Sequence, residues 1–162
     1  MQEEQQLSGP IIDASLVSLD LKAVDAVSAI DELAHLLKDA KRIDSFDVFV
    51  ADVLKRDSEV STEVGWGVSI PHARSAAVLK PTICFGRSKG FHWKEDSTEE
   101  TKLVFMLAAP VVATNKRYMR MLSSLARMLL EPDFREACLQ SDNCQNIVDV
   151  IQDAIKQDAD NF

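Results

Sequence analysis

Apolar residues recur every three or four positions in several stretches of the chain, which is the pattern of a helix that buries one face. The pattern predicts a first helix over residues 26–37 and a second from residue 46 to near residue 58. Asp44 or Ser45 precedes the second helix and can cap its N-terminus. Three further helices are predicted nearer the C-terminus, over residues 115–130, 133–139 and 146–156.

Shorter apolar runs lie between these helices and are typical of strands. They cover residues 15–21, 68–70, 82–87 and 102–109. The run over 102–109 is apolar at almost every position, so we expect this strand to be buried on both faces. Residues 59–67 and 90–100 are more polar, and we expect a loop at the first and a loop or hairpin edge at the second. Pro71 removes a backbone donor just after a predicted strand, so we expect the chain to turn there.

The order of these elements predicts the fold class. Helices stand at both ends of the chain and strands mostly between them, which favours an α/β fold, or α+β in some schemes. We expect one domain over residues 11–158, with a mixed parallel and antiparallel sheet flanked by helices on both faces. A chain of 162 residues that is 46% hydrophobic can build one such core. Residues 1–10 are polar and rich in glutamine, and we expect a disordered tail or a cloning remnant there.

Charge and hydropathy limit the classes of binding partner and the cellular location that we expect for this protein. Lys and Arg total 18 against 26 for Asp and Glu, which gives a net charge of −8. No basic stretch is dense enough to follow a phosphate backbone, so we expect no nucleic-acid partner; a protein with a basic contact face would suit this charge better. No run is long and apolar enough to cross a bilayer, and the start lacks the features of a signal peptide. We therefore expect a cytoplasmic protein that does not itself insert into a membrane.

The sequence lacks the motifs of several common catalytic, metal-binding and phosphate-binding sites. A GxSxG elbow, an HExxH pair and a phosphate-binding glycine loop are all missing. Cys84, Cys138 and Cys144 are widely spaced without a CxxC pattern, so neither a disulfide framework nor a zinc site is indicated. We expect no metal and no cofactor.

Three histidines remain as candidates for chemistry. His35 lies within the first predicted helix, and His92 stands between two aromatic residues, where packing is the ordinary role. His72 differs, because it follows a Ser-Thr pair, two glycines and a proline, a context that predicts an irregular, exposed turn.

A histidine on such a turn can act as a nucleophile toward phosphorus. The attacking nitrogen must be unprotonated, and the other ring nitrogen must hold its proton against a fixed acceptor. Arg56, Ser61 and Thr62 are residue types that stabilise phosphoryl oxygens. From the residues alone, a nucleophilic His72 and an ordinary exposed histidine both stand as interpretations.

The segment around His72 also carries several motifs in a fixed order, KRDSEVSTEVGWGVSIPHARSAAVLKPTICFGRSKGFHW. It resembles the phosphotransferase-system (PTS) IIA domains of the mannitol/fructose class, EIIA type 2, and most closely the fructose branch. The matching positions are Arg56, Asp57, Ser61, Thr62, Gly65, Gly67, Ile70, Pro71 and His72. The later stretch LARMLLEPDFREACL is also similar, and the resemblance covers residues 16–155.

The resemblance implies a phosphocarrier. His72 would accept a phosphoryl group from the histidine carrier protein HPr and donate it to a cysteine of a IIB component for fructose-like sugar uptake. The chain would thus be a phosphotransferase, a component of a protein-Nπ-phosphohistidine–sugar phosphotransferase, and would meet a membrane IIC component only through IIB. Arg56 would stabilise the phosphoryl group, and Ser61, Thr62 and Gly67 would shape the pocket.

Two positions depart from the family pattern. Tyr118 stands where family members commonly have a second histidine, and a tyrosine cannot supply a cationic imidazolium near pH 7. Trp66 replaces a small or acidic residue, and it is either a partner anchor or a packing residue. The missing second histidine keeps an alternative open, a nitrogen-type regulatory IIA module whose phosphorylation state controls partner binding. A domain that has lost activity is a third hypothesis.

Overall fold

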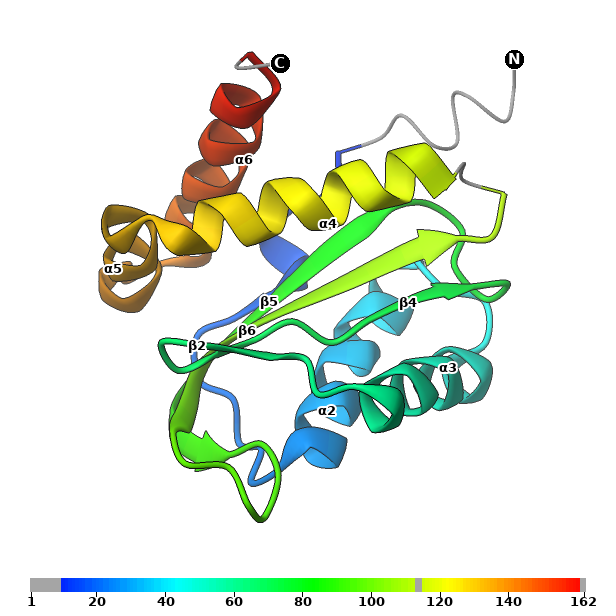
Figure 1. The fold of residues 1–162 in the computed structure, drawn as a ribbon. Helices are drawn as coiled ribbons and strands as arrows, with labels where there is room; N and C mark the ends of the chain where they lie inside the picture. The colour runs from blue at the N-terminus through cyan, green and yellow to red at the C-terminus, as the bar shows by residue number, and fades with distance from the viewer. Residues whose placement is uncertain (1–9, 113–114, 161–162) are drawn as a thin grey trace.

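The computed structural model describes residues 10–112 and 115–160 (Figure 1). The helices of this part are a 3-10 turn η1 (Ala14–Leu16), α2 (Ala26–Asp39), α3 (Phe46–Glu59), α4 (Asn115–Leu130), α5 (Pro132–Gln140) and α6 (Cys144–Asp160). The strands are β1 (Val17–Ser18), β2 (Glu63–Gly65), β3 (Val68–Ser69), β4 (His72–Ser75), β5 (Thr82–His92) and β6 (Glu100–Pro110). All five predicted helices are confirmed. The tail expected over residues 1–10 lies outside the described residues except for Pro10.

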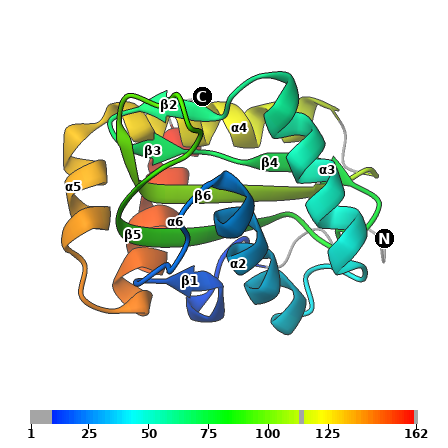
Figure 2. The same cartoon turned by 90° about the horizontal axis from the view of Figure 1, so that it is seen from below.

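The strands form one mixed sheet with the order β1-β5-β6-β3-β2, and β4 also pairs with β6. β1 runs parallel to β5, and β3 and β4 run parallel to β6, whereas the β5–β6 and β2–β3 pairs are antiparallel. Figures 1 and 2 show α2 and α3 against one face of the sheet and α4, α5 and α6 on the other. The predicted single domain with a mixed sheet and helices on both faces is therefore confirmed.

The core lies on both faces of β6. Residues 103–110 are all buried, as the apolar run predicted, because helices cover this strand from each side. The Phe105 ring meets Phe85 edge-on at 5.1 Å between centroids and lies 5.9 Å from Phe134 of α5. The two helices below the sheet start at side-chain caps, since Asp25 accepts from the Ser28 amide and Ser45 accepts from the Val48 amide.

Two local predictions were wrong. Residues 59–67 do not form only a loop, since β2 lies within them and pairs with β3. The chain also does not turn at Pro71. Ser69 pairs with Val104 and His72 pairs with Leu107, so β3 and β4 follow β6 in one register across the interruption. Proline removes one donor from the ladder, but the Pro71 carbonyl still accepts from the Leu107 amide at 3.0 Å. This bond keeps the segment beside β6.

Candidate functional site

His72 is the first residue of β4, and only 8% of its surface is exposed. The exposed turn expected from the sequence is therefore wrong. Parallel pairing with β6 holds the backbone of His72 in the sheet, and α3 packs against β4 from below. The imidazole thus occupies a fixed position beside the interrupted point of the ladder.

The ring of His72 has a defined tautomer. Its Nδ1 lies 2.7 Å from the carbonyl oxygen of Ile70, and because a carbonyl can only accept, Nδ1 must carry the proton. Burial lowers the pKa of His72 below its ordinary value of 6.5, and the charge of Arg56 acts in the same direction, whereas the Ile70 bond and the Asp57 carboxylate oppose it. Near neutral pH the ring is therefore uncharged, with a lone pair on Nε2.

A pocket of about 500 Å³ opens beside this ring. Its walls come from α3, β4 and α4, and they are formed by Asp52, Lys55, Arg56, Glu59, His72, Ala73, Arg74, Tyr118, Met119 and Leu122. Arg56 donates to the Val60 carbonyl at 3.2 Å, and Arg74 donates to the Val111 carbonyl at 2.8 Å. Both guanidinium groups are thus held at the pocket by backbone carbonyls, where they can stabilise an anion bound to His72.

Tyr118 reaches the same pocket from α4. Its ring centroid lies 6.5 Å from that of His72, with the two planes tilted by 51°. Burial raises the pKa of Tyr118 above 10, although the charges of Arg56 and Arg74 oppose this shift. The phenol is therefore protonated at neutral pH and offers one O–H donor, and no positive charge, to the pocket.

The remaining residues predicted for the site lie apart from this pocket. Ser61 is exposed, and its Oγ accepts from the amide of Glu63 at 3.3 Å. Thr62 is buried and donates from Oγ1 to Asp57 at 2.6 Å. Gly67 lies in the β2–β3 turn, where its carbonyl accepts from the Lys102 amide at 2.8 Å. The structure thus brings Arg56, His72 and Tyr118 together, and places the other three behind or beyond them.

Sequence reasoning missed two groups at the pocket and one behind it. Lys55 and Arg74 line the pocket but carry no motif of their own, although each stands within two residues of a predicted site residue. Asp57 belonged to the recognised arginine–acid pair, yet its side chain points inward, to Thr62 and Trp93, and away from the pocket. Arg56 and Asp57 are consecutive in α3 and therefore point in different directions, Arg56 to the pocket and Asp57 into the interior. The helical periodicity of the sequence is the signal that could have distinguished them.

Trp66 lies in the β2–β3 turn with 53% of its surface exposed and a left-handed φ of 56°. The guanidinium carbon of Arg135 in α5 stands 4.5 Å from its ring centroid, a cation–π contact that ties the turn to this helix. Trp66 does not line the pocket of His72. Its packing role is therefore evident, while half of the ring remains open to solvent.

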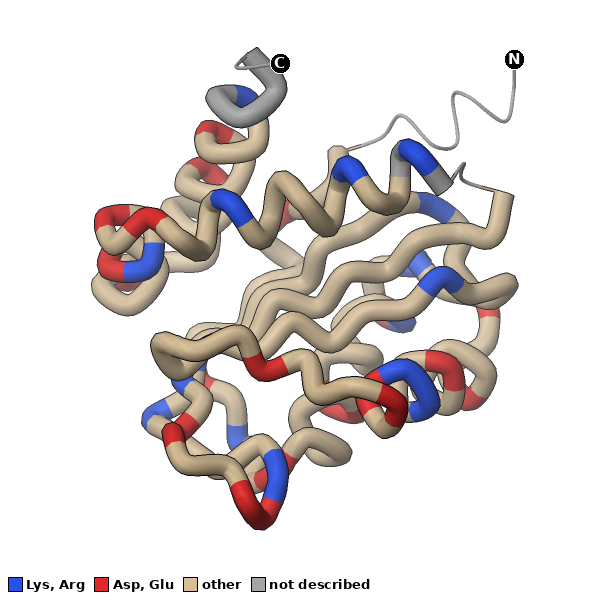
Figure 3. Tube along the Cα trace, in the orientation of Figure 1, with Lys and Arg blue, Asp and Glu red and all other residues tan. Residues whose placement is uncertain are grey.

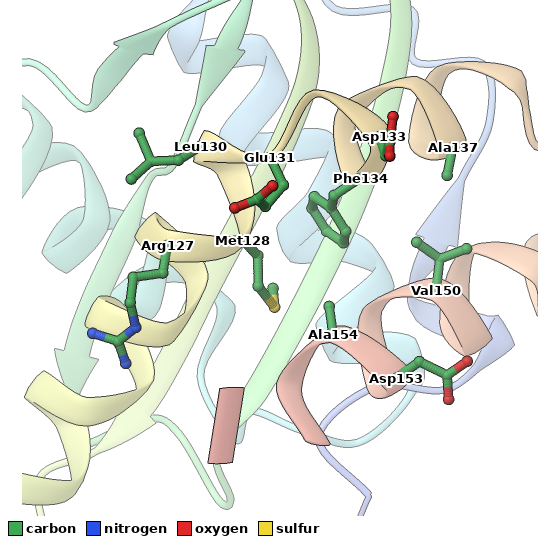
Figure 4. A pocket seen from close by; sticks show the side chains of 10 residues that line it. All are labelled: Arg127, Met128, Leu130, Glu131, Asp133, Phe134, Ala137, Val150, Asp153 and Ala154. Carbon is green, nitrogen blue, oxygen red and sulfur yellow. The ribbon is translucent and has the colours of Figure 1, made fainter. Parts of the chain in front are cut away.

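A second hollow, of about 730 Å³, lies between the end of α4, α5 and α6 (Figure 4). Its floor includes Met128, Phe134 and Val150, and its rim includes Glu131 and Asp133. It shares no lining residue with the pocket of His72 and contains no nucleophilic or basic nitrogen other than that of an arginine. The pocket of His72, in contrast, is lined by a histidine, a lysine and two arginines.

Within residues 10–112 and 115–160, no group of three or more His, Cys, Asp or Glu side chains is placed to hold a metal ion. In the same part of the chain, no helix combines the length and the apolar character that crossing a bilayer requires.

Comparison with known proteins gives a consistent result. The family model described as phosphoenolpyruvate-dependent sugar phosphotransferase system, EIIA 2, matches residues 10–154. The PTS system fructose-specific EIIA component of Haloferax volcanii is 35% identical over 147 residues, which are 90% of this chain and 95% of that protein. The PTS system fructose-specific EIIABC component of Bacillus subtilis is 32% identical over 136 residues, 83% of this chain but 21% of that longer protein.

Solved structures share the fold. Nitrogen regulatory protein IIA-Ntr from Neisseria meningitidis superposes with a TM-score of 0.78 at 23% identity, over 86% of this chain and 95% of that one. Enzyme IIAMTL of Escherichia coli, solved in complex with phosphorylated enzyme IIBMTL, gives a TM-score of 0.71 at 19% identity, over 90% of this chain and 97% of that one. At these identities the structural likeness establishes the fold.

Proposed function

The chain belongs to the EIIA 2 family of the phosphoenolpyruvate-dependent sugar phosphotransferase system, and on that premise we propose that His72 relays a phosphoryl group between two proteins. The donor is phosphorylated HPr, and the acceptor is a cysteine of a IIB component that serves a fructose-like sugar transporter. The protein thereby works in the cytoplasm as a phosphotransferase and reaches a membrane IIC component only through IIB.

One observation carries this proposal, the hydrogen bond from Nδ1 of His72 to the Ile70 carbonyl. With the proton fixed on Nδ1, the lone pair of Nε2 is free to attack phosphorus. A bond forms between Nε2 and phosphorus while the bond from phosphorus to the donor histidine breaks, and the donor nitrogen keeps the electron pair. The phosphoryl group then resides on Nε2, the τ nitrogen of His72.

The second transfer reverses the role of His72. A thiolate of the IIB cysteine attacks phosphorus, the bond from phosphorus to Nε2 breaks, and Nε2 regains its lone pair. Arg56 and Arg74 stabilise the charge on the equatorial oxygens in both steps, and the Tyr118 hydroxyl donates a hydrogen bond. A neutral imidazole is a good acceptor and an adequate leaving group, which suits a reversible relay.

Intact mass measurement tests the proposal. We expect incubation with phosphoenolpyruvate, enzyme I and HPr to add one acid-labile phosphoryl group to the wild type and to a His92→Ala variant, whose histidine is exposed. The His72→Ala variant should gain none. Absence of a mass gain in the wild type, or an equal gain in His72→Ala, contradicts the proposal.

The absence of a second imidazole at Tyr118 favours a second candidate function, regulation of a partner by the phosphorylation state of His72. A regulatory module would accept phosphate and transfer it to no IIB domain. Transfer from the phosphorylated chain to a panel of purified IIB domains separates the two: loss of phosphate to any IIB cysteine supports the relay, and retention against all of them supports regulation.

A further inference from the structure

Three hydrogen bonds, connected through the covalent backbone of Thr62 and of Ile70, lead from the interior of the molecule to the ring of His72. This series begins at Asp57, whose side chain is buried although the preceding residue, Arg56, faces the pocket. Each link is a direct contact of 3.2 Å or less, and none passes through the pocket itself. This arrangement connects a buried charge to the nitrogen that fixes the tautomer.

Asp57 is bound by three donors from two segments of the chain. Its Oδ1 accepts from Thr62 Oγ1 at 2.6 Å and from Trp93 Nε1 at 3.2 Å, and its Oδ2 pairs with Lys94 Nζ at 2.7 Å. Burial opposes the charge, but the bonds to Lys94, Thr62 and Trp93 outweigh it and hold the pKa of Asp57 below 3.8. An ionised carboxylate with these partners fixes the end of α3 against the segment that follows it.

The backbone continues the connection to His72. The Thr62 carbonyl accepts from the Ile70 amide at 2.9 Å, and the Ile70 carbonyl accepts from Nδ1 of His72 at 2.7 Å. Ile70 stands between β3 and β4, where Pro71 interrupts the sheet ladder. The bond to Thr62 therefore holds the amide side of Ile70, the residue whose carbonyl accepts from His72.

We propose that Asp57 is a positioning residue, which through Thr62 and Ile70 holds the proton of His72 on Nδ1 and so keeps Nε2 available as the nucleophile. The catalytic significance of this role rests on the proposed phosphorylation of His72. Asp57 itself touches neither the phosphoryl group nor the pocket. Asp57 instead affects the position of the Ile70 carbonyl, which accepts from Nδ1 of His72, and thereby which of the two ring nitrogens can react.

Matched substitutions at Thr62 isolate the side-chain link. Thr62→Val keeps the shape but removes the hydroxyl that donates to Asp57, whereas Thr62→Ser keeps the hydroxyl, and both retain the backbone bond to Ile70. Asp57→Asn removes the charge that pairs with Lys94. Val53→Ala, a buried residue of the same helix outside this series, controls for loss of stability alone.

The decisive measurement is made on the unphosphorylated, 15N-labelled proteins. Long-range 1H–15N correlation spectra report which ring nitrogen of His72 carries the proton. We expect the proton on Nδ1 in wild type, Thr62→Ser and Val53→Ala, and a mixture of tautomers in Thr62→Val and Asp57→Asn. Phosphorylation by HPr should be about tenfold slower in the last two, a loss typical of removing an outer partner that orients a functional histidine.

The outcomes separate this proposal from the proposed function. If Thr62→Val and Asp57→Asn keep the wild-type tautomer, the positioning role is overturned, even where His72 is still phosphorylated. If the tautomer changes as expected but the wild type accepts no phosphate, the positioning role stands and the proposed function fails. If Asp57→Asn does not fold, the comparison of Thr62→Val with Thr62→Ser decides alone.

Discussion

At the scale of single residues, the burial of His72 determines its charge. A ring that is 8% exposed loses hydration in its cationic form, so the neutral form is favoured at lower pH than in a free histidine. For a nucleophile this is useful, because only the neutral ring has a lone pair to donate.

This burial predicts a pH dependence of stability. The pKa of His72 in the native state lies below its value in the unfolded chain, so the unfolded chain binds more protons between the two values. The contribution to stability is therefore complete above about pH 6.5 and is lost as the pH falls through the native pKa. Between pH 7.5 and 5.5 the free energy of unfolding should decrease more for the wild type than for His72→Gln. If the free energy of unfolding depended on pH equally in His72→Gln and in the wild type, the lowered pKa of His72 in the native state would be contradicted.

Tyr118 leads to a prediction about the phosphoryl equilibrium. A hydroxyl donates one neutral hydrogen bond, whereas an imidazolium would add a charge-assisted one worth about 1 kcal/mol more, or about fivefold in equilibrium constant. At pH 6.5, Tyr118→His should therefore shift phosphate from HPr toward this chain, and Tyr118→Phe should shift it back toward HPr. Quantifying both phosphoproteins at equilibrium checks this. No difference among the three variants would mean that the residue at position 118 does not contact the phosphoryl group.

At the scale of elements, two glycines of the β2–β3 turn, which precedes His72 along the chain, have a positive φ. Gly67 has φ +72°, and a Cβ there would stand 3.0 Å from the Glu100 carbonyl oxygen. Gly65 also has a positive φ, of +93°, but its Cβ would meet nothing within 4 Å. Gly67→Ala should thus cost about 2–3 kcal/mol in urea unfolding, and Gly65→Ala about 1 kcal/mol, because only the first adds a clash to the backbone strain. If Gly65→Ala lowered the free energy of unfolding more than Gly67→Ala, the contact of Gly67 with the Glu100 carbonyl would not be what limits substitution in this turn.

The same elements show how far sequence reasoning reaches. The helices and the buried strand β6 follow from the spacing of apolar residues, and the presence of Arg56 and His72 at one pocket follows from the motif around them. The strand position of His72 did not follow, because Pro71 removes a donor locally while the register of β4 is set by the distant Leu107. Asp57 was missed as a functional residue for a similar reason, since its partner Trp93 is distant in sequence.

At the scale of the whole molecule, the charge near His72 differs from the charge of the protein. The chain carries −8, yet the pocket is lined by the cations Lys55, Arg56 and Arg74 against two carboxylates. Figure 3 shows basic positions on α3, on α4 and on the strands between them, with acidic positions also on α3 and on α5. Under the proposed function, a phosphorylated donor would be attracted to this pocket on a chain of net negative charge, which favours encounters at the pocket.

Reversing one charge at the pocket tests this steering. Lys55→Glu and Lys89→Glu change the net charge equally, but Lys89 lies farther from His72. Leu107 of β6 pairs with His72 on one side and with Ile83 of β5 on the other. Lys89 is six residues beyond Ile83 along β5, which is a distance of about 20 Å. Exposed charges interact little beyond a Debye length of about 10 Å at 0.1 M salt. At low salt, Lys55→Glu should lower the second-order rate of phosphorylation by HPr about three- to tenfold, and Lys89→Glu should lower it much less. The difference should shrink in about 0.5 M salt, because screening removes the attraction but leaves the chemistry of His72 intact. Equal effects of both variants at low salt would assign the rate to net charge, and an effect of Lys55→Glu that persists at high salt would assign Lys55 a direct contact with the phosphoryl group.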